Sequence, residues 1–475
     1  MFGATGATLL GSALFFGTPA DAGFAALRGT VQTPRSVSCG VTCKIPVLLR
    51  LPSVTVVRVD VVGRRAVRRG RVGNHAVRWI LRVTPGRSGT VVLRIRIAGY
   101  RVLTRRVRLI RGQGRTHHAS RTFTGVSAGT VASCALESSG QVFCWGVGTD
   151  GELGDGAMRN SSTPVRVAGI DDAIQLASGA AHTCALRRVG TVVCWGHNFF
   201  GQLGDGTTVN RGAPVPVVGL TNVVQLSANF ANTCAVLGDG TVRCWGRSDT
   251  GSLGDGTPPA DSLASIPHPV AVTGLQDASE VSVGGTHVCA LRRTGTVACW
   301  GDNRWNQLGN GSTDPASLPT EVPNVGDATD IASSQVRTCV VLSAGAVICW
   351  GDNDKGQLGT GVPSKSAGPA TVQGLTAGET LTGGINDAMC ARQRGATTPV
   401  CWGENDFGQL GSIVSATLTQ PLTVPLDGVD QVSLGRQHSC AIAALKIYCW
   451  GENADGELGD GTTTSRVTPR LVTIN

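Results

Sequence analysis

Aromatic residues are scarce in this chain of 475 residues: they make up 4% of it, and there are two tyrosines. Long apolar runs are also missing beyond the amino-terminal leader, so no later segment is long enough to span a bilayer. No nucleic-acid motif with interleaved aromatic and basic residues is present, which disfavours nucleic acid as a partner. The chain has 66 glycines instead, and this composition favours many short strands and tight turns over long helices.

Acidic residues are almost absent from the first quarter of the chain. Residues 1–120 contain 21 of the 41 Lys and Arg residues but two acidic residues, Asp21 and Asp60, which gives a net charge of +19. The remaining residues carry a net charge of −10, and the two values sum to the +9 of the whole chain. So sharp a division predicts two domains with different partners.

The amino terminus resembles a signal peptide in part. Residues 9–16 are apolar, and Ala20-Asp21-Ala22 has the A-x-A form of a signal-peptidase site, but the first basic residue is Arg28. We interpret residues 1–22 as a signal peptide or short hydrophobic leader. A membrane anchor is the alternative, although Pro19 and the many Gly and Thr residues argue against it.

A repeat with a period near 50 dominates the chain after residue 125. Its marker is Cys-Trp-Gly, which begins at Cys144, Cys194, Cys244, Cys299, Cys349, Cys401 and Cys449. A fixed period of 20–50 residues is typical of solenoids and propellers.

The second repeat shows the expected anatomy of one unit. Three strands are predicted at Ala173–Ser178, His182–Arg187 and Thr191–Gly196, followed by the glycine-rich loop Gly201–Gly206 and a fourth strand at Pro214–Val218. Four short strands per unit without helical spacing indicate a propeller blade. The prolines of the fourth strand fit an outer edge, where a missing N–H costs little.

Fourteen of the 16 cysteines fall into pairs nine to eleven residues apart. If Gly190 closes a three-residue hairpin loop, Leu186 lies opposite Val192 and Cys184 lies opposite Cys194, within reach of a disulfide. Zinc sites usually need more closely spaced cysteines and a second ligand pair, so disulfides are favoured, and with them an oxidising compartment. The predicted bridges are Cys134–Cys144, Cys184–Cys194, Cys234–Cys244, Cys289–Cys299, Cys339–Cys349, Cys390–Cys401 and Cys440–Cys449.

The order Cys-Ala-Leu, Gly-x-Val-x-Cys-Trp-Gly and Gly-Gln-Leu-Gly-Asp-Gly resembles the regulator of chromosome condensation repeat. The resemblance covers residues 125–474 and implies a seven-bladed β-propeller. It departs from the pattern at Asn306, which replaces the first glycine of the loop motif, and at Ser412, which ends the motif early. The paired cysteines resemble those of secreted members and not those of nuclear ones.

Residues 30–112 carry a different pattern, in which Arg alternates with aliphatic residues. Five strands are predicted at 45–51, 54–62, 76–84, 90–98 and 101–110. They suit a small, basic, Ig-like β-sandwich, joined to the propeller (residues 125–475) by a linker at 113–124. The arginine face has two interpretations: it attracts an anionic polymer, or it is a solvated sheet face that could also dock on the acidic propeller. The pairing state of Cys39 and Cys43 is left open.

Several motifs resemble those of catalysis or metal binding, but we expect each of them to have a structural role. Gly125-Val-Ser-Ala-Gly129 matches the G-x-S-x-G string of hydrolases but lies in a predicted strand without the following helix. The acidic groups around Asp155 and Asp460 lack EF-hand spacing. His182, His287 and His438 lie two residues before a cysteine in non-adjacent repeats, where they cannot easily share a metal. No cofactor is expected.

Two residues in each repeat, between the Trp-Gly segment and the glycine loop, vary while their neighbours stay constant. Since they follow the third strand, ring symmetry predicts that all lie on one face of the disc. The strongest candidates for a binding face are Phe199, Phe200, Arg304, Trp305, Asp406 and Phe407. Alternatively, the second residue of each pair packs against its own turn. The loop 257–268 is expected to open onto the same face.

The sequence therefore predicts an all-β, secreted or cell-surface binding module with an unidentified protein or surface polymer as partner, expected to be a monomer and not an enzyme. The family that the repeats resemble also contains nucleotide-exchange factors for GTPases and secreted inhibitors of enzymes such as β-lactamases. The paired cysteines argue against the first of these functions, because it requires a reduced intracellular setting. A glycan- or peptide-directed enzyme with an active site dispersed over the propeller face is the alternative from another class.

Overall fold

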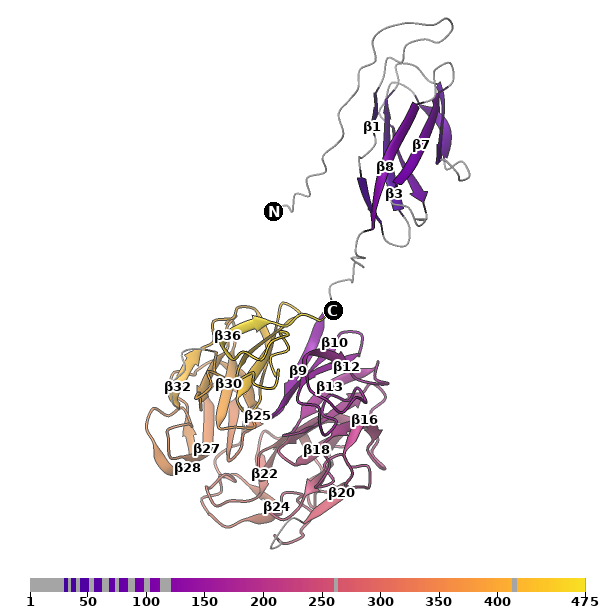
Figure 1. Ribbon diagram of the computed structural model, residues 1–475. Helices are drawn as coiled ribbons and strands as arrows, with labels where there is room; N and C mark the ends of the chain where they lie inside the picture. The colour runs from indigo at the N-terminus through magenta and orange to yellow at the C-terminus, as the bar shows by residue number, and fades with distance from the viewer. Residues whose placement is uncertain are drawn as a thin grey trace, which may run out of the picture. The chain divides into compact units, whose positions relative to one another are not determined.

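The computed structural model describes residues 121–259, 264–411 and 417–474, apart from the side chains of residues 365–367, and the backbone of eight strands between residues 30 and 111 (Figure 1). The chain divides into two units, Met1–Ser120 and Arg121–Asn475. The predicted leader and linker residues 113–120 lie outside the described residues. No helix in the described part of the chain could cross a membrane.

The amino-terminal unit contains the five predicted strands and three further ones. A three-stranded sheet has the order β1-β3-β6, and a five-stranded sheet has the order β2-β8-β7-β4-β5. The β-sandwich, its arginine face and the state of Cys39 and Cys43 stay predictions, because no side chain of this unit is described. The strands are β1 (Thr30–Gln32), β2 (Ser36–Cys39), β3 (Cys43–Arg50), β4 (Thr55–Val61), β5 (Arg68–Val72), β6 (Val77–Val83), β7 (Thr90–Ile97) and β8 (Leu103–Arg111).

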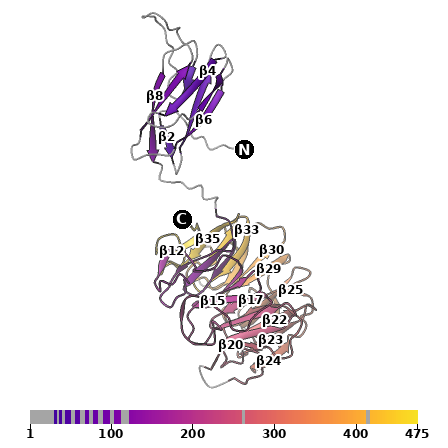
Figure 2. The same ribbon diagram turned by 90° about the vertical axis from the view of Figure 1, so that its right-hand side faces the viewer.

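The second unit is a ring of seven four-stranded antiparallel sheets, which we number blades 1 to 7 in chain order (Figures 1 and 2). This confirms the predicted seven-bladed β-propeller. The first strands line the central cavity of the ring: β9 (Phe123–Ala128), β13 (Ala173–Ser178), β17 (Val223–Asn229), β21 (Ala278–Val283), β25 (Ala328–Ser333), β29 (Gly378–Gly383) and β33 (Val429–Leu434).

The remaining strands follow outward in chain order within each blade. The second strands are β10 (Ala132–Glu137), β14 (His182–Arg187), β18 (Asn232–Leu237), β22 (His287–Arg292), β26 (Arg337–Leu342), β30 (Ala388–Gln393) and β34 (His438–Ala443). The third strands are β11 (Val142–Gly146), β15 (Val192–Gly196), β19 (Val242–Arg247), β23 (Val297–Gly301), β27 (Val347–Asn353), β31 (Val400–Gly403) and β35 (Lys446–Gly451). The outer edge strands are β12 (Ser161–Arg166), β16 (Arg211–Pro216), β20 (Ser265–Ala271), β24 (Ala316–Glu321), β28 (Ser364–Thr371), β32 (Leu418–Thr423) and β36 (Arg466–Leu471).

Blade 2 agrees with its prediction except at the outer strand. The hairpin turns at Gly190, whose φ of 77° is open to glycine at little cost, and Cys184 lies opposite Cys194 in the register. Strand β16 begins three residues before the predicted Pro214 and ends at Pro216. Val217 still donates its N–H to the carbonyl of Val192, so the apolar run continues the pairing after the regular strand ends.

All seven predicted disulfides are present, each between the second and third strands of one blade. Their Cα atoms are 4.0–4.1 Å apart, and every one of these cysteines is buried. The last hairpin is one residue shorter because Ala444 and Leu445, with φ of 49° and 60°, form a two-residue turn. Seven buried disulfides indicate an oxidising environment.

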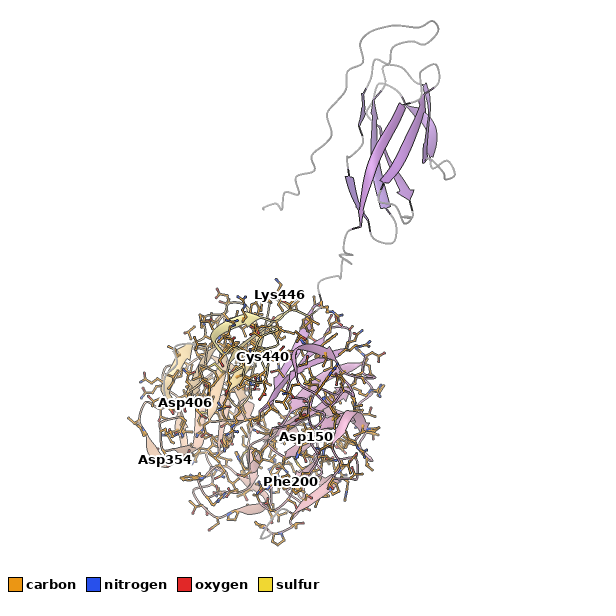
Figure 3. All side chains as sticks on the ribbon, viewed as in Figure 1. Asp150, Phe200, Asp354, Asp406, Cys440 and Lys446 are labelled. Atoms are coloured by element: carbon orange, nitrogen blue, oxygen red, sulfur yellow. A yellow bond between two sulfur atoms is a disulfide. The ribbon has the colours of Figure 1, made fainter. Side chains whose placement is uncertain are left out.

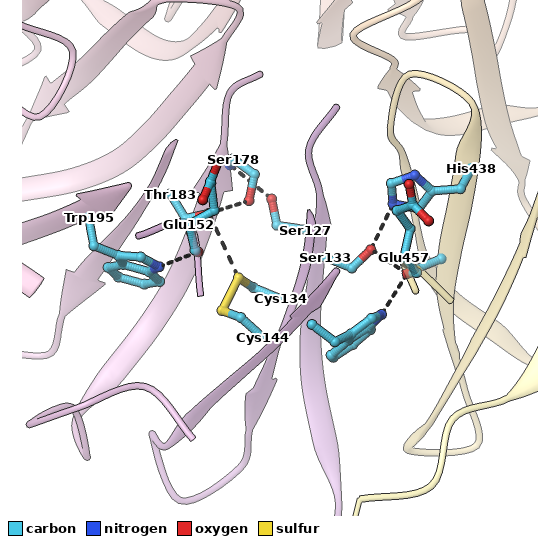
Figure 4. The surroundings of a disulfide bond; sticks show 12 residues. Ser127, Ser133, Cys134, Cys144, Glu152, Ser178, Thr183, Trp195, His438 and Glu457 are labelled. Carbon is cyan, nitrogen blue, oxygen red and sulfur yellow. Dashed lines mark hydrogen bonds between the residues drawn. A yellow bond between two sulfur atoms is a disulfide. The ribbon is translucent and has the colours of Figure 1, made fainter. Parts of the chain in front are cut away.

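The hydrophobic core lies between neighbouring blades. The tryptophan of Cys-Trp-Gly is fully buried in each blade, and in every blade except blade 6 its indole N–H donates to a loop carbonyl of the preceding blade. Trp195 of blade 2 donates to the carbonyl of Glu152 at 2.9 Å, and Trp145 of blade 1 donates to that of Glu457 in blade 7 (Figure 4). The ring therefore closes with the same joint that links its other blades.

Asn306 shows why the loop motif tolerates its missing glycine. The residue has a φ of 56°, in the left-handed region, where asparagine is the most tolerated residue after glycine. Its side-chain oxygen also accepts the N–H of Gly311 at 3.3 Å. Ser412, the other departure, lies outside the described residues.

Candidate functional site

All seven variable pairs lie on one face of the ring, which we call the loop face. In an antiparallel meander, the connections between strands one and two and between strands three and four emerge on the same side. The variable pairs belong to the latter connections in every blade. Figure 3 labels Asp150, Phe200, Asp354 and Asp406, which come from blades 1, 2, 5 and 6. The predicted loop 257–268 belongs to the same set, and residues 260–263 of it lie outside the described part.

In every blade except blade 3, the backbone of the pair is held by a buried side chain two residues further on; in blade 3 the hydroxyl of Ser252 at this position donates to the carbonyl of Arg247 instead. The N–H of Phe200 donates to Oε1 of Gln202 at 2.9 Å, and the N–H of Trp305 donates to Oε1 of Gln307 at 2.9 Å. The same bond recurs at Asp150, Lys355, Phe407 and Asp455, with a Gln or Glu oxygen as acceptor. A constant backbone thus presents side chains that are free to differ between blades.

The aromatic residues of blade 2 form a cluster with the neighbouring blade. Phe199 is 56% exposed, and its ring meets that of Phe200 edge to face, with centroids 5.0 Å apart. Phe200 is half-buried under the guanidinium of Arg247 from blade 3, 5.5 Å from the ring centroid. Asp249 holds that guanidinium by a bond of 2.7 Å. The first residue of the pair therefore faces solvent, while the second packs beside its neighbour.

The other candidates stand alone or in pairs. Arg304 is exposed and bound by Asp302 at 2.8 Å, beside the half-buried Trp305. Asp406 and Phe407 are both exposed, the latter at 37%. The structure thus places all six candidates on the loop face but distributes them over blades 2, 4 and 6, with the blade 2 cluster as their one close group.

Acidic residues gather in the loops of blades 6, 7 and 1. We call this set the acidic sector: Asp387, Glu404, Asp406, Glu452, Asp455, Glu457, Asp150 and Glu152. Burial raises the pKa of Glu404, and the carboxylates of Asp387 and Asp406 raise it further. Burial also raises the pKa of Glu457, with Asp455 and Glu452 adding to it. The carboxylates within each blade are close enough to repel one another, and this repulsion contributes to the raised pKa values of Glu404 and Glu457.

Three buried histidines bridge neighbouring blades. Nε2 of His182 lies 2.8 Å from the hydroxyl of Thr233, and that hydroxyl donates to the carbonyl of Gln202. Because the hydroxyl proton is committed to the carbonyl, the imidazole must be the donor through Nε2. Burial lowers the pKa of His182 to about 3. His287 and His438 make the same bridge to Thr338 and Ser133.

The other motifs that resemble catalytic or metal sites also have structural roles. Ser127 of the G-x-S-x-G string lies in β9, and its hydroxyl accepts the N–H of Ser178 at 2.9 Å (Figure 4). Ser133 and His438 have the spacing of a nucleophile and base, at 2.7 Å, but both are buried in a joint between blades. Asp155 and Asp460 accept backbone N–H groups of their own turns. Among the described residues, no group of three or more metal-ligating side chains comes together.

Sequence reasoning missed the polar joints between blades. The buried guanidinium of Arg337 takes the place of a histidine in blade 5 and bridges Asp352 at 3.1 Å and Asp387 at 2.8 Å. A signal for the histidine joints was present: a Cβ at Gly179 would collide with the ring of His182, and Gly284 and Gly435 stand in the same relation to their histidines. The spacing Gly-x-x-His therefore marks them.

Comparison with known proteins bears on the propeller. A family model described as the RCC1-like domain matches residues 103–393 and, in an overlapping second alignment, residues 172–475. Among solved structures, yeast RCC1 (Prp20) bound to Kap60 has a TM-score of 0.62 at 20% identity and covers 77% of this chain and 90% of its own. Prp20p of Saccharomyces cerevisiae, described with its binding to Gsp1p and histones, has a TM-score of 0.61 at 20% identity, over 74% and 88%. No curated protein matches.

Proposed function

The chain belongs to the RCC1-like domain family, and from that premise we propose that it is a secreted or cell-surface binding module that uses its loop face to bind a protein or surface polymer without catalysis. The observation that carries the proposal is the contrast within each loop. In six of the seven blades the backbone of the variable pair is held by a buried Gln or Glu, while the paired side chains differ from blade to blade. Specific recognition needs side chains that are held in place by a rigid backbone and that differ from one position to the next.

The composition of the loop face supports a protein partner. Aromatic and arginine side chains dominate the energetics of protein interfaces, and the exposed Phe199 and Arg304 and the half-buried Trp305 are of these types. The acidic sector would attract a partner with a basic surface and speed its association. Both features lie in the loops of one face, so a single partner could contact them together.

The disulfides support a secreted or cell-surface location. Thiols are kept reduced in the cytosol, whereas these seven pairs are positioned for oxidation throughout the ring. The yeast relative is described as binding Gsp1p and histones. Because the disulfides favour an oxidising compartment, we propose a different, extracellular partner for this chain.

Alanine substitutions at Phe199 and Trp305 test the proposal once a partner has been captured with the full chain. Each substitution should weaken binding by more than about 1–2 kcal/mol, while the melting temperature stays the same. Val189→Ala is the matched control, because Val189 is 71% exposed but lies in a hairpin turn on the opposite face. If the melting temperature falls and the affinity holds, the aromatics serve turn packing and the proposal fails.

A further inference from the structure

The inner strands are joined around the cavity by glutamine side chains. Each blade presents the open edge of its first strand to the blade before it, with backbone N–H and C=O groups that need partners. Gln225 of blade 3 accepts the N–H of Val281 at 3.1 Å and donates to its carbonyl at 3.0 Å. Gln175 does the same at Leu226, and Gln431 at Val126. We call these contacts the glutamine belt.

Blade 4 has a glutamate at this position of the belt. Glu280 is the third residue of β21, as Gln225 is of β17, and it faces Ile331 of blade 5. A carboxamide both donates and accepts, and a carboxylic acid can do the same, but a carboxylate only accepts. Among the described residues no hydrogen bond links the Glu280 carboxyl to Ile331. The joint between blades 4 and 5 therefore lacks the pair of bonds that closes the joint before it.

We infer that this joint is a proton-dependent clasp: when Glu280 takes up a proton its carboxylic acid bridges the N–H and C=O of Ile331, and when it ionises it can no longer donate to the C=O, so the two-bond bridge is lost. The proton is the single species exchanged, and it comes from solvent through the central cavity that Glu280 lines. The protonated side chain differs from that of Gln225 in one group, OH in place of NH2, so the same geometry serves both.

The charges around Glu280 favour the protonated form. Strand β17 carries no ionisable side chain, and Glu280 is the one ionisable residue among those that line the cavity. On β22, Arg292 is bound by Asp277 and His287 by Thr338. The facing β25 contributes Asp330, whose Oδ2 accepts the N–H of Leu381 at 2.6 Å.

The nearest charge is therefore of the same sign. Burial, and then the Asp330 carboxylate, raise the pKa of Glu280 to about 8, and burial raises the pKa of Asp330 to about 6. A carboxyl whose pKa is raised on folding stabilises the fold most below its unfolded pKa. It loses that stabilisation as the pH rises through the folded value. The clasp should thus be closed in mildly acidic solution and open above about pH 8.

Melting temperatures of the full chain between pH 5 and pH 9 test the clasp. Glu280→Gln should raise the melting temperature by several degrees at pH 9 and by much less at pH 5. Gln225→Glu should give the joint between blades 3 and 4 the same pH dependence as that of Glu280, and so should lower the melting temperature more at pH 9 than at pH 5. The control Glu321→Gln removes an exposed carboxyl from outer strand β24 and should change neither.

Two further measurements follow the clasp directly. Carbon-13 NMR of labelled glutamate should show one carboxyl that titrates well above the others and disappears in Glu280→Gln. Hydrogen exchange at pH 8 should be slower in the β25 peptide of that variant than in the natural chain. If the melting curves of Glu280→Gln and the natural chain differ equally at pH 5 and pH 9, or if every glutamate titrates in its usual range, the inference is wrong.

Discussion

Nε2 of His438 lies 2.7 Å from Oγ of Ser133, and this pair joins the last blade of the ring to the first. The serine hydroxyl donates onward to the carbonyl of Glu457, which also receives the indole N–H of Trp145. One carbonyl thus collects two donors from blade 1. Backbone bonds, such as that from the N–H of Phe123 to the carbonyl of Leu445 at 3.0 Å, also join the two blades, and within the described part of the chain each blade consists of four consecutive strands.

The buried histidines predict sensitivity to acid. Burial lowers the pKa of His438 and of His287 to about 4, from 6.5. The unfolded chain therefore binds more protons than the folded chain between those values, and stability present above pH 6.5 is lost as the pH falls through about 4. For each histidine the slope is about 1.4 kcal/mol per pH unit.

His182→Asn is the variant to test this, because Asn232 stands at the same position in blade 3. Urea unfolding at a series of pH values from 4 to 7 should show that the free energy of unfolding depends less steeply on pH, by the contribution of one histidine. His268→Asn, on an exposed position of β20, is the control and should leave the slope unchanged. An unchanged slope in the first variant would mean that His182 is protonated in the fold.

The disulfides should contribute similarly in every blade. Removing one pair, as in Cys184→Ala with Cys194→Ala, releases a loop of about ten residues and should cost about 2–3 kcal/mol by the chain-entropy account. Peptide mapping of the natural chain without reductant should recover all seven pairs. Recovery of mostly free thiols would remove the support for an oxidising compartment.

The two units should be separable. A chain that begins at Arg121 retains every strand of the propeller and should fold alone. It should also lose affinity for a polyanion such as heparin, since it lacks the 21 basic residues of positions 1–120. Binding to a heparin column at equal salt measures this. Equal retention of the full and shortened chains would rule out the predicted role of the arginine face.

The belt position also lacks a glutamine in blades 1, 5 and 6, where Gly125, Asp330 and Thr380 stand, and the joint between blades 6 and 7 offers a second test. Thr380 stands where a glutamine stands in blades 2, 3 and 7, and a cavity of about 220 Å³ opens there, lined by Thr380, Arg392 and Gln431. Thr380→Gln should restore a bridge to Val432 and raise stability by about 0.5–1.5 kcal/mol. Thr380→Val is the matched control, since it offers no donor or acceptor. If both variants behave alike in thermal unfolding, the gain comes from shape and not from hydrogen bonding.

Local spacing was enough to predict the blades. The separation of Cys184 from Cys194, with Gly190 between them, led directly to the observed register, because a hairpin depends on neighbouring residues alone. The outer strand was displaced by up to three residues, since an edge strand pairs on one side and has weaker local signals. The variable pairs were found because a repeat makes variation visible against a constant frame.

The joints between blades could not be predicted from the same signals. The bridge from His438 to Ser133 spans 305 positions, and the alternation of a single strand does not contain it. Gln175, Gln225 and Gln431 resemble ordinary polar residues of half-exposed strands until the next blade is placed beside them. Gly125, Glu280, Asp330 and Thr380 become exceptions only in comparison with those glutamines.

The sequence by itself determined the seven four-stranded units, their disulfides and the face on which the variable loops emerge, because all of these depend on contacts within about fifty residues. The tertiary structure alone decided which polar groups meet when the blades close into a ring. There the open edge of each inner strand needs partners from another repeat, so burial makes His182, Arg337 and Glu280 parts of the joints. The shifted pKa values of His182 and Glu280 follow from that burial, which no single repeat contains.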